Sequence, residues 1–257
     1  MLKVYRFALS MNSKILTISQ AANLLGVSIQ TLRRWDDSGK LSSVSRKSAG
    51  HRHYSKSDIE SFIKESLRDL SLAKMARNWV TSDLATEPFS DFYCPDISVF
   101  QARLTRLQNE LGQVKRLGKM FPLIVAITGE MGNNSFDHNL GNWPDVLGIF
   151  FAHHAEKGTI VLADRGQGIL STLKKVKPEL TNHQDALRTA FTEVISGRAP
   201  EYRGNGLKFV RDVVTANEIR LFFQTGNAQL KIQKDDSRIS VQKSALTFRG
   251  CLAVVNF

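Results

Sequence analysis

The stretch 130–138 (EMGNNSFDH) constrains the fold of this chain most, because its polar residues recur at helical spacing beside an apolar run. Pro122 and the apolar residues 123–127 precede it, and this order predicts a helix, since proline is tolerated in a first turn. Residues four, seven and eight positions apart share one face of a helix. The polar residues on that face are Glu130, Asn134, and Asp137 or His138. Such a face can hold a hydrated cation and position a water molecule.

A first glycine motif follows a short β-rich run. Residues 158–162 (GTIVL) predict a strand, which leads directly into ADRGQGI at 163–169. Gly166 and Gly168 let the backbone turn sharply and approach a ligand closely. Asp164, at the end of the strand, can accept a hydrogen bond from an exocyclic amine.

A second glycine motif opens another helix. The sequence RGNGL at 203–207 precedes KFVRDVV, which has the pattern of a helix. The first N–H groups of such a helix can bind phosphate oxygens. Neither glycine motif is specific alone, because it matches neither the G-x-G-x-x-G dinucleotide fingerprint nor the G-x-x-x-x-G-K-[ST] P-loop.

In this order and spacing, the three motifs resemble the N box, the G1 box (D-x-G-x-G-I) and the G2 box (G-x-G-L) of the GHKL superfamily. That superfamily includes the ATPase domains of DNA gyrase B subunits, MutL proteins, histidine kinases and anti-sigma-factor kinases. The resemblance runs from about Trp79 to the C-terminus. It implies an α/β sandwich with a mixed sheet, and ATP and Mg²⁺ as cofactors.

The resemblance also implies roles for individual residues. Asn134 matches the asparagine that binds Mg²⁺, and Asp164 matches the aspartate that reads the adenine amine. The other residues expected to bind ATP are Asp137, His138, Gly166, Gly168, Ile169, Arg203, Gly204, Asn205, Gly206 and Leu207. Glu130 matches the catalytic acid that polarises the attacking water in the hydrolysing branch; the alternative is a carboxylate that only orders water or magnesium.

The segment between the two glycine motifs is long for a loop. We expect a helix at 183–195, followed by a polar stretch. The resemblance implies that this segment is the ATP lid, in which Arg198 and Arg203 are candidates for neutralising phosphate charge. Each of them is more often a solvated surface arginine.

Apolar residues between 100 and 114 recur every three or four positions and predict an amphipathic helix. This helix could pair with a second copy of the chain in a homodimer. The pattern is short for a coiled coil, so a helix packed on the ATPase-like sheet is the favoured interpretation.

The net charge of +11 is unevenly distributed. Residues 1–78 hold 14 Lys and Arg against 6 Asp and Glu, whereas the remainder holds 21 against 18. A basic excess confined to one part of the chain is the electrostatic footprint of a module that binds nucleic acid.

This basic part contains two short predicted helices joined by a glycine-containing turn. The first lies within 17–28, and Ser28 caps the second, which starts at Ile29 and closes near Gly39. The arrangement predicts a helix-turn-helix, which places recognition residues in the major groove of double-stranded DNA. The residues expected to face DNA from the second helix are Ser28, Gln30, Thr31, Arg33 and Arg34.

The sequences LRRW at 32–35 and GHRHY at 50–54 resemble signatures of the winged helix-turn-helix domain of MerR-type regulators and phage excisionases. The match covers about residues 14–65, and it implies that Arg52 and Tyr54 anchor a wing to the DNA backbone. We therefore predict a multidomain α+β protein. A small helical winged domain spans 13–70, and a GHKL ATPase-like domain spans 71–257 and includes a linker and a leading helix.

Other features of the sequence exclude several classes. Cys94 and Cys251 have no C-x-x-C partner, so neither a disulfide framework nor a zinc site is expected. No apolar run approaches the roughly 20 residues of a membrane span, and the first eleven residues lack a secretory cleavage site. We expect no membrane and a cytoplasmic location. Strand-like alternation at 218–224, 228–233 and 246–257, with turns at 225–227 and 249–250, completes the predicted sheet.

These features favour a DNA-binding regulator in which Mg-ATP, bound and in some readings hydrolysed, controls DNA binding or recruitment of a partner protein encoded nearby. One alternative is an anti-sigma-like protein serine/threonine kinase, and another is a nucleotide-binding antitoxin or defence component. A histidine autokinase is disfavoured, because no histidine-bearing phosphoacceptor helix precedes the predicted ATPase region.

Overall fold

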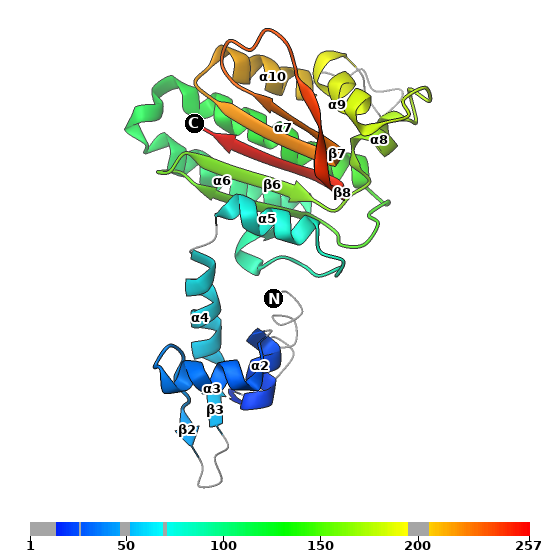
Figure 1. The fold of residues 1–257 in the computed structure, drawn as a ribbon. Coiled ribbons are helices and arrows are strands. Elements are labelled where there is room, and N and C mark those ends of the chain that lie inside the picture. The colour runs from blue at the N-terminus through cyan, green and yellow to red at the C-terminus, as the bar shows by residue number, and fades with distance from the viewer. Residues whose placement is uncertain (1–13, 26, 47–51, 69–70, 195–205) are drawn as a thin grey trace. The chain divides into compact units, whose positions relative to one another are not determined.

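The computed structural model describes residues 14–25, 27–46, 52–68, 71–194 and 206–257 (Figure 1). Arg198, Arg203, Gly204 and Asn205 lie outside these ranges. The chain divides into two compact units, Met1–Ser71 and Leu72–Phe257.

The first unit combines helices with a three-stranded antiparallel sheet of order β1-β3-β2. Its elements are β1 (Ile15–Thr17), α2 (Ile18–Leu25), α3 (Ile29–Asp37), β2 (Ser45–Arg46), β3 (Arg52–Ser55) and α4 (Lys56–Arg68). The Ser28 side chain accepts a hydrogen bond from Thr31 N and caps α3, as its position in the sequence predicts. Gly39 has φ +72° and turns the chain just after α3 ends.

The second unit is built on a five-stranded sheet of order β4-β5-β6-β8-β7. Its elements are α5 (Leu72–Val80), η1 (Ser90–Phe92), β4 (Tyr93–Cys94), α6 (Ile97–Gly112), η2 (Lys115–Met120), α7 (Phe121–Asn139), β5 (Ile149–His154), β6 (Thr159–Asp164), α8 (Gly168–Leu173), α9 (His183–Thr192), α10 (Gly206–Ala216), β7 (Arg220–Ile232) and β8 (Val241–Asn256). The predicted α+β class is therefore confirmed.

The predicted mixed sheet is wrong, because every pairing in the second sheet is antiparallel. Helices connect β6 to β7, and both strands run antiparallel to β8 and hence in the same direction as each other. The β7–β8 hairpin then brings β8 back between them, so these two strands are not neighbours. A helical crossover is present, but it does not create a parallel pair.

The turns expected at 225–227 and 249–250 also lie elsewhere. Both segments are inside long strands: the register shifts at Thr225/Gly226 mark a β-bulge in β7, and Gly250 lies within β8 with φ +81°. The chain turns instead between Ile232 and Val241, where Asp235 takes a positive φ of 63°. Glycine therefore marks irregularities of the strands here and not the hairpin loop.

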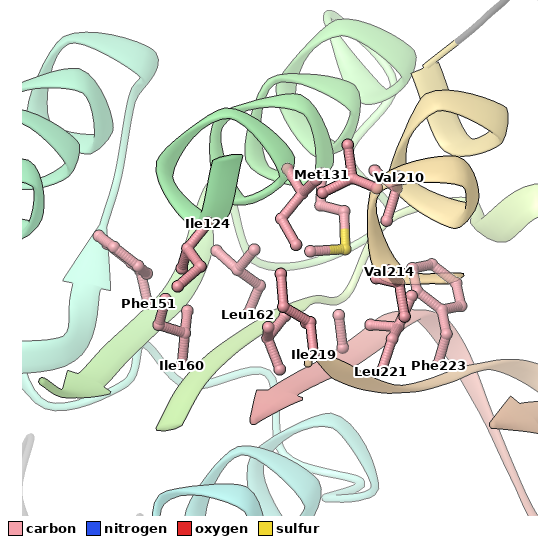
Figure 2. Packing of buried hydrophobic residues seen from close by; sticks show 14 of the residues in the cluster. Ile124, Met131, Phe151, Ile160, Leu162, Val210, Val214, Ile219, Leu221 and Phe223 are labelled. Carbon is pink, nitrogen blue, oxygen red and sulfur yellow. The ribbon is translucent and has the colours of Figure 1, made fainter. Parts of the chain in front are cut away.

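The main core lies between the sheet and α6, α7 and α10 (Figure 2). Strand side chains of one parity face these helices, including Phe151, Ile160, Leu162, Leu221 and Phe223. A Cβ on Gly132 of α7 would lie 2.1 Å from the Phe100 ring of α6, so the two helices approach closely. The apolar face of α6 is thus occupied within this unit, as the favoured interpretation of its sequence predicts.

The opposite face of the sheet is covered by α5, which the sequence treats only as part of a linker. Leu72, Met75, Ala76, Trp79 and Val80 are buried, and the Trp79 ring lies 6.4 Å from that of Phe150. In Figure 1, α5 lies against β6. The second unit therefore has helices on both faces of its sheet.

Candidate functional site

The predicted polar face of α7 meets the start of α10. The Asn134 amide donates a hydrogen bond of 3.2 Å to Glu130 Oε1. A Cβ on Gly206 would lie 2.0 Å from Glu130 Oε1 and 3.1 Å from Asn134 Nδ2. Only glycine permits this approach, because any larger residue would displace the carboxylate. The first-turn N–H groups of α10 therefore begin beside the Glu130–Asn134 pair.

The same helix holds Asp164 through a second polar stripe. Asp164 is 2% exposed, and Ser135 Oγ donates to its Oδ2 over 2.8 Å. Gly166 N donates to the other carboxylate oxygen, also over 2.8 Å. Burial raises the pKa of Asp164 to about 6, although hydrogen bonds from Gly166, Ser135 and Cys251 oppose the shift. At neutral pH the site thus contains a buried carboxylate that accepts hydrogen bonds from Gly166, Ser135 and Cys251.

Asn139, at the end of α7, orders the turn that follows Asp164. It is 4% exposed; its Oδ1 accepts from Gln167 N over 2.8 Å, and its Nδ2 donates to Ser135 O over 2.8 Å. A Cβ on Gly166 would lie 2.1 Å from Asn139 Nδ2. Ser135 and Asn139 are not among the site residues predicted from the sequence. Their i, i+4 spacing beside Glu130 and Asn134 is the signal that could have identified them.

Gly168 and Thr225 complete the turn on its other side. Gly168 takes φ +77° and begins α8. Thr225 Oγ1 accepts from Ile169 N over 3.3 Å and donates to Gly250 O over 2.9 Å. The β-bulge at Thr225 therefore ties the first glycine motif to both long strands. Ile169 itself is half-buried and packs on the core, as does Leu207 after the second glycine motif.

Asp137 and His138 lie further along α7, and both are half-buried. Burial, followed by the positive charge of Lys175, lowers the pKa of His138, so its imidazole is neutral at pH 7. Gln167 Nε2 donates to the carbonyl oxygen of His138 over 3.1 Å. His138 is thus linked to the first glycine motif through its backbone.

On the first unit, most of the residues predicted to face DNA are exposed on or beside α3. Gln30, Arg33 and Arg34 are exposed, as is Ser28. Thr31 is half-buried, and its hydroxyl lies 2.9 Å from Ser28 Oγ. Gln30, Arg33 and Arg34 are therefore exposed on α3, and Ser28 is exposed at its N-cap.

The two predicted wing residues lie differently. Tyr54 is fully buried, and its hydroxyl donates to Leu32 O over 3.4 Å, so the expected contact with the DNA backbone is wrong. Arg52 forms ion pairs with Asp36 (3.1 Å) and Asp37 (2.7 Å) and donates to Arg33 O. Both residues therefore fix β3 on α3.

Within residues 14–25, 27–46, 52–68, 71–194 and 206–257, no three His, Cys, Asp or Glu side chains converge to hold a metal ion. No helix in the same ranges is both long and apolar enough to cross a membrane.

Comparison with known proteins identifies part of the first unit. The family model described as MerR family regulatory protein matches residues 17–54, which confirms the resemblance of the helix-turn-helix. A type II methyltransferase of Escherichia coli, M.Eco47II, is 41% identical over 54 residues. That match covers 21% of this chain and 13% of the methyltransferase, so only a short segment is shared.

Solved structures with similarity to this chain include two topoisomerase domains. The ATPase region of Saccharomyces cerevisiae topoisomerase II has 16% identity and a TM-score of 0.35, covering 51% of this chain and 36% of that one. The topoisomerase IV ATP-binding domain of Francisella tularensis, in complex with a small-molecule inhibitor, has 14% identity and a TM-score of 0.34, covering 56% and 39%.

Proposed function

We propose that this protein is a DNA-binding regulator whose second unit binds Mg-ATP. One observation carries the proposal: a single helix, α7, contacts both glycine motifs. Glu130 and Asn134 adjoin Gly206, while Ser135 holds Asp164. Three motifs distant in sequence thus meet on one helix, in the order that the GHKL resemblance implies.

The polar groups of this site fit an adenine nucleotide. The Asp164 carboxylate accepts from three protein donors, fewer than the roughly four lone pairs of an ionised carboxylate, and the remaining acceptor capacity suits an exocyclic amine of a base. Among the residues that the structure describes, no cation pairs with the buried charge of Asp164, a costly arrangement that a ligand donor would relieve. The N-terminus of α10 offers backbone N–H groups to phosphate oxygens.

The site also fits Mg²⁺ bound with a nucleotide. Mg²⁺ is commonly held by one or two protein oxygens together with substrate phosphates, so a cluster of carboxylates is not required. The Asn134 amide lies next to the first turn of α10 with its Nδ2 nearest Gly206, and its carbonyl oxygen is the group that would coordinate the ion. When bound, the ion would neutralise charge on the phosphate oxygens.

Glu130 is the residue that would decide between binding and hydrolysis. Its carboxylate accepts from Asn134 and adjoins Gly206, so it lies next to the proposed phosphate position. We propose that it orients a water molecule there as a general base.

The first unit supplies the proposed DNA contact. Gln30, Arg33 and Arg34 are exposed on α3, and the match to the MerR family covers this helix. The basic excess of residues 1–78 favours association with phosphate. A regulator acting on double-stranded DNA would work in the cytoplasm, with homodimerisation and a protein partner encoded nearby as further elements of the proposal.

Calorimetry with Mg-ATP tests the nucleotide site. We expect wild type to bind and Asp164→Asn and Asn134→Ala to lose binding. Asp83→Asn and Asn109→Ala, which alter exposed residues, serve as controls and should bind normally. Phosphate release that disappears in Glu130→Ala would identify hydrolysis. A wild-type protein that binds no adenine nucleotide would overturn the proposal.

A further inference from the structure

Arg165 lies inside the first glycine motif, between Asp164 and Gly166, yet its side chain contacts other protein groups. Its guanidinium is buried, with a side chain 7% exposed. Nε and Nη2 contact the Asp145 carboxylate, the latter over 2.7 Å. A buried cation is tolerated only when its hydrogen-bond donors are paired, and Asp145 pairs with the donors on one side of the planar guanidinium.

The other side of the guanidinium binds the C-terminal end of α5. Arg165 Nη1 donates to Trp79 O and to Ser82 O, each over 2.7 Å. The last carbonyls of a helix lack intrahelical partners, and a cation placed there also complements the helix dipole. Arg165 therefore acts as a C-terminal cap for α5, supplied by the residue next to Asp164.

The helix that Arg165 caps is the one through which the chain enters the second unit. α4 of the first unit ends at Arg68, and α5 begins at Leu72. The apolar side chains of α5 are buried on the sheet, and Trp79 Nε1 donates to Thr86 O over 2.7 Å. A change at the turn of residues 164–166 can therefore reach the C-terminal end of α5 through Arg165, and the N-terminal end of the same helix, at Leu72, follows the connection to the first unit.

We propose that Arg165 couples the nucleotide site to DNA binding, by transmitting changes in the Asp164 turn to the end of α5. The inference rests on the proposed function and adds its route of regulation. Arg165 is a positioning residue, because its guanidinium contacts protein groups and not the ligand. A ligand that moves or rigidifies the Asp164 turn shifts the guanidinium between Asp145 and α5, which changes how firmly the end of α5 is held.

Arg249 provides a matched control. Its Nη2 contacts the same Asp145 oxygen over 2.7 Å, but its side chain is 57% exposed and lies on β8. Replacing Arg249 therefore perturbs Asp145 from outside, without removing the bonds to Trp79 O and Ser82 O.

The test measures the affinity for DNA with and without saturating Mg-ATP, using the full chain and a fragment that contains its own promoter. We expect Mg-ATP to change the wild-type affinity by at least about fivefold, the lower end of typical allosteric coupling. In Arg165→Gln, the ratio of the DNA affinities with and without Mg-ATP should lie within about twofold of one, while the variant still binds Mg-ATP in calorimetry. Arg249→Gln should keep the wild-type ratio.

Hydrogen exchange of wild type supplies a second readout that does not depend on a variant that folds. Mg-ATP should change the exchange of amides at the end of α5, around residues 79–83, because local opening reports how firmly a helix end is held. Unchanged exchange there, or an Arg165→Gln variant with the wild-type ratio, overturns the coupling. If wild type binds Mg-ATP but its DNA affinity does not change, the coupling is overturned and the proposal of nucleotide binding stands. If wild type does not bind ATP, the coupling and the nucleotide-binding proposal are both overturned.

Discussion

Ser135 donates a 2.8 Å hydrogen bond to the buried carboxylate of Asp164, so the helix that carries Glu130 and Asn134 also orients the end of β6. Two parts of the candidate site, which the sequence separates by 29 residues, thereby share one rigid support. Preorganisation of this kind lowers the cost of ordering the site when a ligand binds.

Ser135→Ala should weaken Mg-ATP binding about tenfold, because a lost hydrogen bond to a charged group costs roughly 1.5 kcal/mol. The carboxylate of Asp164 would keep its bonds from Gly166 and the Cys251 backbone but lose the one that ties it to α7. Calorimetric titration measures the change, with Ser98→Ala, an exposed serine of α6, as the control. An affinity equal to that of wild type would contradict the role assigned to Ser135.

The stability of the protein should depend on the ionisation of Asp164. Burial raises its folded pKa from 3.8 to about 6, so the folded state holds this proton more tightly than the unfolded state. The free energy of unfolding should therefore fall as pH rises from about 4 to about 6, by about 3 kcal/mol from this group.

Asp164→Asn removes that ionisation and provides the comparison. The difference in free energy of unfolding between variant and wild type, measured by urea denaturation, should grow in favour of the variant from pH 4.5 to pH 7. A difference that stays constant over this interval would show that Asp164 titrates normally in the folded protein.

Gly166→Ala should destabilise the protein by about 1–3 kcal/mol, the usual cost of overpacking. The added Cβ would lie 2.1 Å from Asn139 Nδ2, and the buried amide cannot move without breaking its bond to Gln167. The cost should be smaller in an Asn139→Ala background, which gives a coupling of at least about 1 kcal/mol in a double-mutant cycle.

Gly112→Ala is the control for this cycle, since the nearest atom to its added Cβ is 3.9 Å away. Thermal or urea denaturation provides the free energies. Additive effects of the substitutions at 166 and 139 would indicate that these residues do not press on each other.

On the first unit, Arg33→Ala and Arg34→Ala should each weaken binding to a promoter fragment and reduce the dependence of affinity on salt by about one unit of slope if the lost contact is to phosphate. Tyr54→Phe should leave affinity unchanged, because the Tyr54 hydroxyl is buried against Leu32 O. Fluorescence anisotropy at several salt concentrations measures both. A Tyr54→Phe variant that loses DNA binding without loss of stability would restore the contact predicted from its sequence.

Local signals sufficed for some elements and not for others. Pro122 and the polar spacing at 130–138 predicted the helix that became α7, and Ser28 predicted the start of α3. Each of these signals determines structure only within a few residues of its own position. The roles of Ser135 and Asn139 depend on β6 and the turn after it, so their partners could not be read from helical spacing alone.

Longer-range relationships limited the prediction further. Residues 72–80 are too short and too mixed with polar residues to identify a helix that covers the far face of a sheet. Tyr54 was expected on a DNA-binding wing, although its burial follows from β3 packing against α3. The antiparallel order depends on where β8 inserts, which no local pattern encodes.

The insertion of β8 between β6 and β7 also has a temporal consequence. β6 is synthesised long before β8, yet Ala163 pairs with Leu252, and Gly250 fits against the backbone of Asp164. During translation β6 therefore leaves the ribosome with one edge unpaired, and contacts this distant in sequence form slowly. A nascent chain that stalls before Val241 would present that edge to other chains, where strand addition leads to aggregation.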